Sequence, residues 1–137
     1  MTVAITTTRK RAIPQKMVRL LSLLATKILG DTYTLSVVFI GNARSQTLNT
    51  TYRQKNYPTN VLAFPLSDTE GEIFINTEKA QREARHFSHT PETHIVYLFI
   101  HGCLHLKGFT HGDAMEQEEQ KYFTQALATF TTKPHRV

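Results

Sequence analysis

The sequence has a single cysteine and no long uninterrupted hydrophobic run. With Cys103 alone, no disulfide can form within the chain, and this cysteine usage is typical of a reducing compartment, so we expect a cytoplasmic protein. Arg19 and Lys27 interrupt the apolar stretch near the beginning, and no segment reaches the roughly eighteen apolar residues that suggest a membrane span. The chain also lacks an internal repeat and a glycine-rich phosphate loop, which argues against solenoid folds and P-loop nucleotide binding.

Acidic residues are the minority among the charged ones. The chain has 16 Lys and Arg against 11 Asp and Glu, a formal net charge of +5 and a pI near 9.5. This balance favours polyanionic partners without specifying one. A basic cluster comprises Arg9, Lys10, Arg11, Lys16 and Arg19. It is either a phosphate-facing patch or the solvated face of the first helix.

Hydrophobic periodicity predicts an α/β (α+β) fold in one domain, residues 1–137, with a mixed sheet of about four strands and surrounding helices. We expect an edge strand at the beginning, strands at 33–40, 61–64 and 72–76, and helices at 14–29, 43–53, 78–87, 91–107 and 113–130. Asn42 is the expected cap of the second helix, Leu48 and Tyr52 are expected to pack inward, and Pro65 is expected to end its strand. TTKPHRV, 131–137, is typical of a frayed tail.

Three histidines near the end of the apolar helix have the spacing of metal ligands. His101 and His105 are four residues apart, so a helix places both imidazoles on one face. Gly108 is suited to the left-handed residue that ends a helix, after which the chain can turn back and deliver His111. Three imidazoles leave one coordination position free, as in catalytic zinc sites. The alternative, three unrelated histidines on a core helix, does not explain this spacing.

The spacing H-x-x-x-H-x-x-G-x-x-H is that of the metzincin proteases, except at one position. Those enzymes need a glutamate general base directly after the first histidine, where this chain has Gly102. A peptidase is therefore disfavoured, although Asp113 or Glu116 could replace the base. Capping of the last helix explains both carboxylates without chemistry. A metal ion here can still activate water or polarise a phosphoryl oxygen.

HGCLHLKGFTH, 101–111, resembles the HGxLHLxGxDH signature of the YbeY family, described as single-strand-specific, metal-dependent endoribonucleases of ribosomal RNA maturation. The resemblance extends through LNTTYRQKNYPTNVLAFP, 48–65, and GEIFIN, 71–76. Two positions depart from the pattern: Thr110 and Glu72 replace the usual aspartates. The first departure puts in doubt the bond that this aspartate makes near the ligands.

The resemblance implies a zincin-like metal-binding helix, a zinc or similar divalent ion on the three histidines, and single-stranded RNA, ribosomal RNA and the small ribosomal subunit as partners. It also makes Arg53 of the YR motif a catalytic or phosphate-binding group, a role suited to a guanidinium that holds two phosphate oxygens. By position alone, Arg53 is a solvated helix-end residue. Lys55, Asn56 and Tyr57 either contact RNA or form an exposed turn.

Three other histidines precede the signature, and we do not expect them to bind the metal. His86 and His89 are interpreted as surface residues, and His94 as a satisfied histidine near the mouth of the cleft, since roughly 10 Å of helix separates it from His101. The sequence therefore predicts a metal-dependent ribonuclease, with a non-catalytic RNA-binding assembly factor as the main alternative. In that alternative the metal only stabilises the fold.

Overall fold

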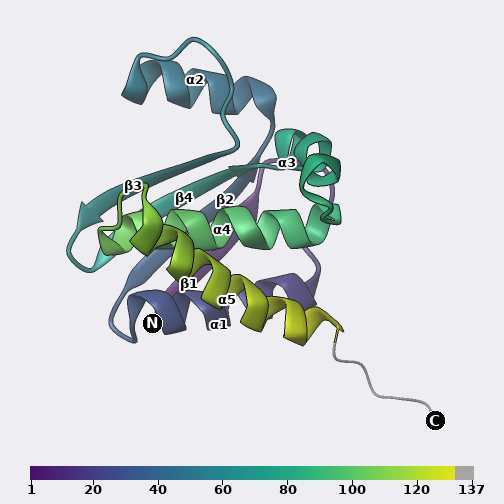
Figure 1. Cartoon of the computed structure of the whole chain (residues 1–137). Coiled ribbons are helices and arrows are strands. Elements are labelled where there is room, and N and C mark those ends of the chain that lie inside the picture. Colours follow the sequence, from purple (N-terminus) through teal and green to yellow (C-terminus); the bar gives the residue numbers. More distant parts are fainter. Residues whose placement is uncertain (132–137) are drawn as a thin grey trace.

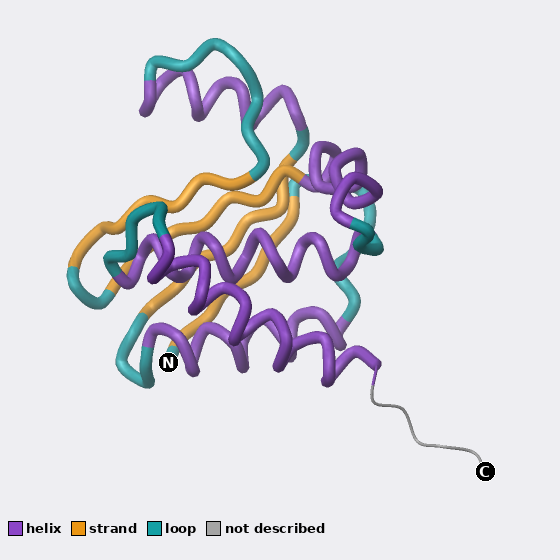
Figure 2. Tube along the Cα trace, in the orientation of Figure 1, coloured by secondary structure: helices purple, strands orange, loops and turns teal. Residues whose placement is uncertain are grey.

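The computed structural model describes residues 1–131, which form four strands and five α-helices around one sheet (Figures 1 and 2). In chain order the elements are β1 (Thr2–Thr7), α1 (Gln15–Leu29), β2 (Thr34–Ile40), α2 (Asn42–Arg53), β3 (Val61–Ser67), β4 (Glu70–Asn76), α3 (Thr77–Ala84), the 3₁₀ turn η1 (Arg85–Phe87), α4 (Pro91–Lys107) and α5 (Asp113–Thr131). Residues 132–137, which hold nearly all of the expected frayed tail, lie outside the described part.

The sheet is mixed, as predicted, with the strand order β1-β2-β4-β3. β1, β2 and β4 run parallel, whereas β3 pairs antiparallel with β4 through a short turn at Asp68 and Thr69. The expectation that Pro65 ends its strand is wrong, because β3 continues to Ser67. β3 is an edge strand with a register irregularity beside Pro65, and an edge tolerates a residue without an N–H donor.

One hydrophobic core lies between the sheet and the helices α1, α4 and α5, which cover the same face (Figure 1). Leu21 of α1, Val37 of β2, Ile73 of β4 and Phe99 of α4 are completely buried there. The apolar residues of α4 therefore place this helix in the middle of the domain, as its composition predicted. No helix among residues 1–131 is long and apolar enough to cross a membrane.

α2 differs from the other long helices because the residues it buries are polar. Ser45 and Asn49 are its buried residues, and Figure 1 shows α2 standing above β3, apart from the three helices of the core. Two expectations for α2 are wrong. Gly41, not Asn42, is the N-cap, because Gly41 is extended whereas Asn42 is the first residue of the helix. Tyr52 is 63% exposed, since no core lies beneath it.

Candidate metal centre

The helix α4 carries His101 and His105, and its beginning matches the sequence expectation. The Thr90 hydroxyl accepts a hydrogen bond from the Thr93 N–H at 3.1 Å, Thr93 bonds back to the Thr90 N–H, and Pro91 occupies the first turn. These bonds satisfy N–H groups that a helix N-terminus otherwise leaves unpaired. The buried residues of α4 pack into the core and thereby fix the rotation of the helix about its axis. His101 and His105 lie on a side of the helix that is only half-buried.

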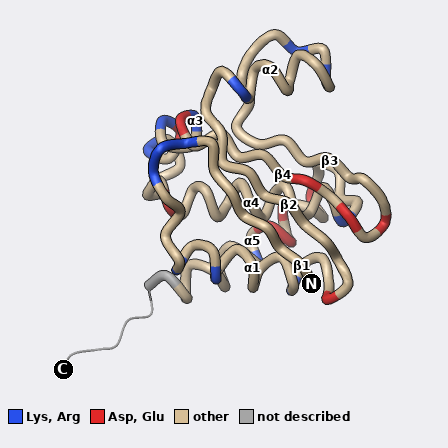
Figure 3. The backbone as a smooth tube through the Cα atoms, turned by 180° about the vertical axis from the view of Figure 1, so that it is seen from behind, with Lys and Arg blue, Asp and Glu red and all other residues tan. Residues whose placement is uncertain are grey.

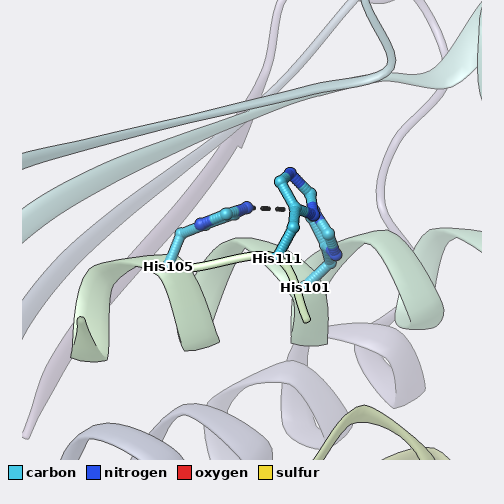
Figure 4. A group of neighbouring side chains, drawn as sticks. All are labelled: His101, His105 and His111. Carbon is cyan, nitrogen blue, oxygen red and sulfur yellow. Dashed lines mark hydrogen bonds between the residues drawn. The ribbon is translucent and has the colours of Figure 1, made fainter. Parts of the chain in front are cut away.

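The end of α4 turns the chain back toward the histidines. Gly108 has φ +111°, and its N–H donates to the His105 carbonyl at 3.0 Å while the Phe109 N–H donates to the Leu104 carbonyl at 3.0 Å. This pair of bonds is the Schellman motif, which needs a left-handed residue at the position of Gly108. His111 follows three residues later and faces the helix it has just left (Figure 4).

Hydrogen bonds on the far side of each helical imidazole determine which nitrogen is free. His105 Nδ1 lies 3.1 Å from the Phe109 carbonyl, which can only accept, so Nδ1 donates. His101 Nδ1 donates to the Glu119 carboxylate on α5. In both neutral rings the lone pair is then on Nε2. The two Nε2 atoms lie 3.1 Å apart and face each other.

The three imidazoles fit a metal ion by their donor chemistry and their spacing. One ligand atom from each of His101, His105 and His111 lies within 4.8 Å of the others. Two nitrogens bound to one tetrahedral zinc at about 2.0–2.1 Å are roughly 3.3 Å apart, close to the Nε2 separation of the first two. Figure 4 shows the rings converging from α4 and from the segment after it. This group can therefore hold a metal ion, as the spacing predicted.

The pKa of His105 also favours ligation. Burial lowers it most, the nearby His101 lowers it further, and the bond to the Phe109 carbonyl opposes the decrease. A lowered pKa keeps the imidazole neutral, which is the form that binds metals.

A cleft of about 660 Å³ contains the three histidines and Arg53. Its walls are formed by the end of α2, by residues 59–64 around β3, and by the end of α4 with the segment to His111. Arg53, the last residue of α2, is exposed at this cleft, so the tertiary structure brings the predicted cation and the predicted ligands together. Among the described residues, no Asp or Glu lines the cleft.

Sequence reasoning missed Glu119. Asp113 and Glu116, the carboxylates considered near His111, are exposed residues of the first turn of α5, whereas the buried Glu119 bonds to His101. A signal was present, because Glu119 follows Met115 by four residues and precedes Phe123 by four, which places a carboxylate on the buried stripe of the helix. Buried carboxylates need a partner, and His101 is that partner.

The structure also explains why a glycine follows His101. A Cβ atom at Gly102 would lie 3.2 Å from Ile73 Cδ1, because α4 packs tightly against β4 at this point. A side chain at this position would have to displace the Ile73 side chain by a few tenths of an ångström, so glycine fits here more easily than a larger residue.

His94 and His89 form a separate cluster. His94 is completely buried rather than near the mouth of the cleft, which corrects our expectation, and its Nε2 lies 3.2 Å from Glu83 Oε1. The Nδ1 atom of His94 lies 3.0 Å from Nδ1 of His89. His89 is half-buried, which corrects the expectation that it is an ordinary surface residue. As predicted, His94 is satisfied within the protein and is not part of the three-histidine group.

The charged residues are distributed unevenly over the surface. Figure 3 shows Lys and Arg around α2 and over α3 with the adjacent loop, and acidic residues at the turn between β3 and β4. In the predicted basic cluster, Arg9 pairs with Glu78 at 3.4 Å and Lys10 and Arg11 follow it in the loop before α1. Within the described chain none of these residues lines the cleft, and a phosphate-binding role for them stays a prediction.

Comparisons with known proteins agree with the site. A family model described as Endoribonuclease YbeY matches residues 3–131. Endoribonuclease YbeY from Aster yellows witches'-broom phytoplasma (strain AYWB) is 44% identical over 86 residues, covering 56% of this chain and 59% of that protein. The protein of this name from Alkaliphilus metalliredigens (strain QYMF) is 34% identical over 108 residues, covering 71% of this chain and 70% of that protein. The region of this chain that matches the phytoplasma protein thus spans only 59% of the length of that protein.

The fold has a solved counterpart as well. The solution structure of TM1509 from Thermotoga maritima superposes with a TM-score of 0.69 at 25% identity, covering 99% of this chain and 100% of that one. The family match extends over almost all of the described residues, and it includes the histidines, the glycine and the arginine that form the cleft. The chain therefore belongs to the YbeY family.

Proposed function

We propose that this protein is a metal-dependent endoribonuclease that cuts single-stranded RNA, with a zinc ion held by His101, His105 and His111. The proposal extends to maturation of ribosomal RNA on the small ribosomal subunit in the cytoplasm, and to residues 1–137 as one catalytic domain. The proteins of the same family described above are named endoribonucleases, which supports RNA cleavage.

The observation that carries the proposal is the convergence of two functions in one cleft. Three imidazoles that can hold a cation and one guanidinium, Arg53, line the same 660 Å³ space, although α2 and α4 are far apart in the sequence. Both groups can stabilise the negative charge that builds on the phosphate oxygens as a phosphodiester bond breaks. A bound zinc ion supplies Lewis acidity toward a phosphate oxygen and increases the acidity of water.

Residues of this chain would orient the metal ligands and hold the phosphate group. Glu119 and the Phe109 carbonyl fix the rotation and tautomer of His101 and His105, so both Nε2 lone pairs point at the same place. The guanidinium of Arg53 can offer paired N–H donors to two phosphate oxygens. No described Asp or Glu lines the cleft, so its walls lack the carboxylate base that the metzincin pattern would supply. This arrangement favours a phosphodiester over a peptide as substrate.

Cleavage of an end-labelled RNA with a single-stranded tail tests the proposal directly. The wild type is assayed as purified, after chelation and after return of zinc, beside His111→Ala. His86→Ala is the matched control, because His86 is an exposed histidine outside the cleft. We expect cleavage to disappear with the chelator and in His111→Ala, and to persist in His86→Ala.

The assay also separates the catalytic proposal from the assembly-factor alternative. Equal cleavage by the wild type and His111→Ala would reveal a contaminating nuclease and remove the support for catalysis. If neither protein cut the RNA while both bound it, and if chelation unfolded the domain, the metal would have a purely structural role.

A further inference from the structure

An exposed aromatic side chain directly precedes the proposed phosphate-binding arginine and contacts a residue that lines the cleft. Tyr52 precedes Arg53 at the end of α2 and is 63% exposed. Its ring lies 5.3 Å from the ring of Phe64, between centroids and at an interplanar angle of 57°, and Phe64 lines the cleft. Phe64 in turn lies 5.9 Å from Phe74 of β4 in an edge-to-face contact. Tyr52 is thus supported from one side and open on the rest of its surface.

The segment that holds Tyr52 is tied down by polar contacts rather than by a core. Asn49 Nδ2 donates to the Tyr57 carbonyl at 2.8 Å, and the Thr59 N–H donates to Ser45 Oγ at 2.9 Å. The Thr50 hydroxyl donates to the Lys55 carbonyl at 3.0 Å. These bonds fasten the loop 54–60 to α2. An exposed ring on such a fixed segment loses little conformational freedom when a ligand stacks on it.

A fixed exposed ring beside a cation suits one chemical group in particular. Aromatic side chains bind unpaired nucleobases by stacking, and a neighbouring arginine binds the adjoining phosphate. Resting on the proposed function, we infer that Tyr52, supported by Phe64, is a stacking site for an unpaired nucleobase that flanks the phosphate held at Arg53. A base in a duplex has both faces covered by its neighbours, so this site would select single strands.

The inference is tested by combining variants of the protein with variants of the RNA. The probes are single-stranded oligoribonucleotides of one sequence, each with one abasic nucleotide at a successive position. Their affinities are measured for the full chain in chelator, which prevents cleavage, once circular dichroism shows that the chelated chain is folded. The protein variants are Tyr52→Ala, Tyr52→Phe and Tyr52→Leu. Leu23→Ala is the matched control, because Leu23 is 52% exposed on α1 and does not line the cleft.

We expect Tyr52→Ala and Tyr52→Leu to lower affinity for intact RNA on the order of tenfold, and Tyr52→Phe and Leu23→Ala to leave it unchanged. At one abasic position the wild type should lose a similar factor while Tyr52→Ala loses almost nothing more, since the contact is already gone. Wild-type affinity in Tyr52→Leu, with melting temperature preserved, would show that the ring only covers Phe64 and would overturn the inference. The inference would also be overturned if, at every abasic position, the loss of affinity from the missing base and the loss from Tyr52→Ala simply multiplied, because no base would then be coupled to Tyr52.

Zinc-dependent cleavage of the unmodified RNA is measured in parallel. If the wild type cuts the RNA but shows no coupling between Tyr52 and any base, the stacking site fails and the proposed nuclease stands. If the coupling is present and the zinc-loaded wild type does not cut, the binding site stands and the nuclease fails.

Discussion

Glu119 of α5 accepts a hydrogen bond from Nδ1 of His101 on α4, and it thereby joins the last helix of the described chain to the candidate metal centre. The carboxylate is nearly buried, and the bond leaves the His101 Nε2 lone pair facing His105. A carboxylate in this position orients a ligand and increases its basicity. The packing of α5 on α4 therefore has a direct consequence for metal binding.

Replacing Glu119 with Gln should weaken zinc binding by about 10–100-fold, because the neutral amide orients His101 less strongly and removes the negative charge behind it. Competition against a chromophoric chelator measures the affinity. Glu116→Gln is the control, since Glu116 lies exposed in the first turn of the same helix. Equal affinities for both variants and the wild type would mean that Glu119 only fills space beside α4.

Arg53→Ala should lower the rate of RNA cleavage about a hundredfold or more while leaving zinc affinity unchanged, because Arg53 lines the cleft but is not part of the three-histidine group. Arg53→Lys should recover only part of the rate, since an ammonium group lacks the paired donors of guanidinium. Arg44→Ala, at the other end of α2, is the control. A comparable loss in that variant would indicate general electrostatic attraction instead.

Gly108→Ala should destabilise the protein by roughly 1–2 kcal/mol, because an L side chain at φ +111° is strained. Thermal unfolding checks this, and each kcal/mol should lower the melting temperature by about 4 °C. Lys107→Ala, one residue earlier and exposed, should have little effect. If Gly108→Ala melts with the wild type, the turn that delivers His111 must relax without cost.

The cluster of His89 and His94 should make stability dependent on pH. Burial, and then the neighbouring His94, lower the pKa of His89 below its ordinary value of 6.5. At pH values between the lowered pKa of His89 in the folded chain and its ordinary pKa of 6.5 in the unfolded chain, His89 binds more protons in the unfolded chain. The stabilising contribution is fully present above pH 6.5 and is lost as the pH falls below it.

Melting temperatures in chelator, measured from about pH 7.5 to about pH 5, test this dependence. The decrease toward acid should be smaller in His89→Gln than in the wild type and unchanged in His86→Gln. His86 is exposed, whereas His89 contacts the buried His94. A decrease of the same size in all three proteins would assign the acid sensitivity to other groups.

The features that the sequence predicted correctly depend on neighbouring residues along the chain. The spacing of His101 and His105, the start of α4 at Thr90 and Pro91, and its end at Gly108 follow from helix periodicity and capping, which act within one or two turns. The number of strands in the sheet follows from similarly local patterns. The role of Arg53 came instead from the family resemblance, and only the structure brings that residue to the ligands.

Tertiary structure decided the features that join distant segments. The bond from His101 to Glu119 crosses eighteen residues, and the cleft that contains Arg53 depends on how α2 stands above β3. Tyr52 remains exposed because no core lies under α2, and Pro65 remains in a strand because β3 has a free edge. Residue patterns determine which helices and strands form and which faces are apolar, because those preferences are local. Which side chains then meet depends on the packing of elements against one another, and local patterns do not encode that arrangement.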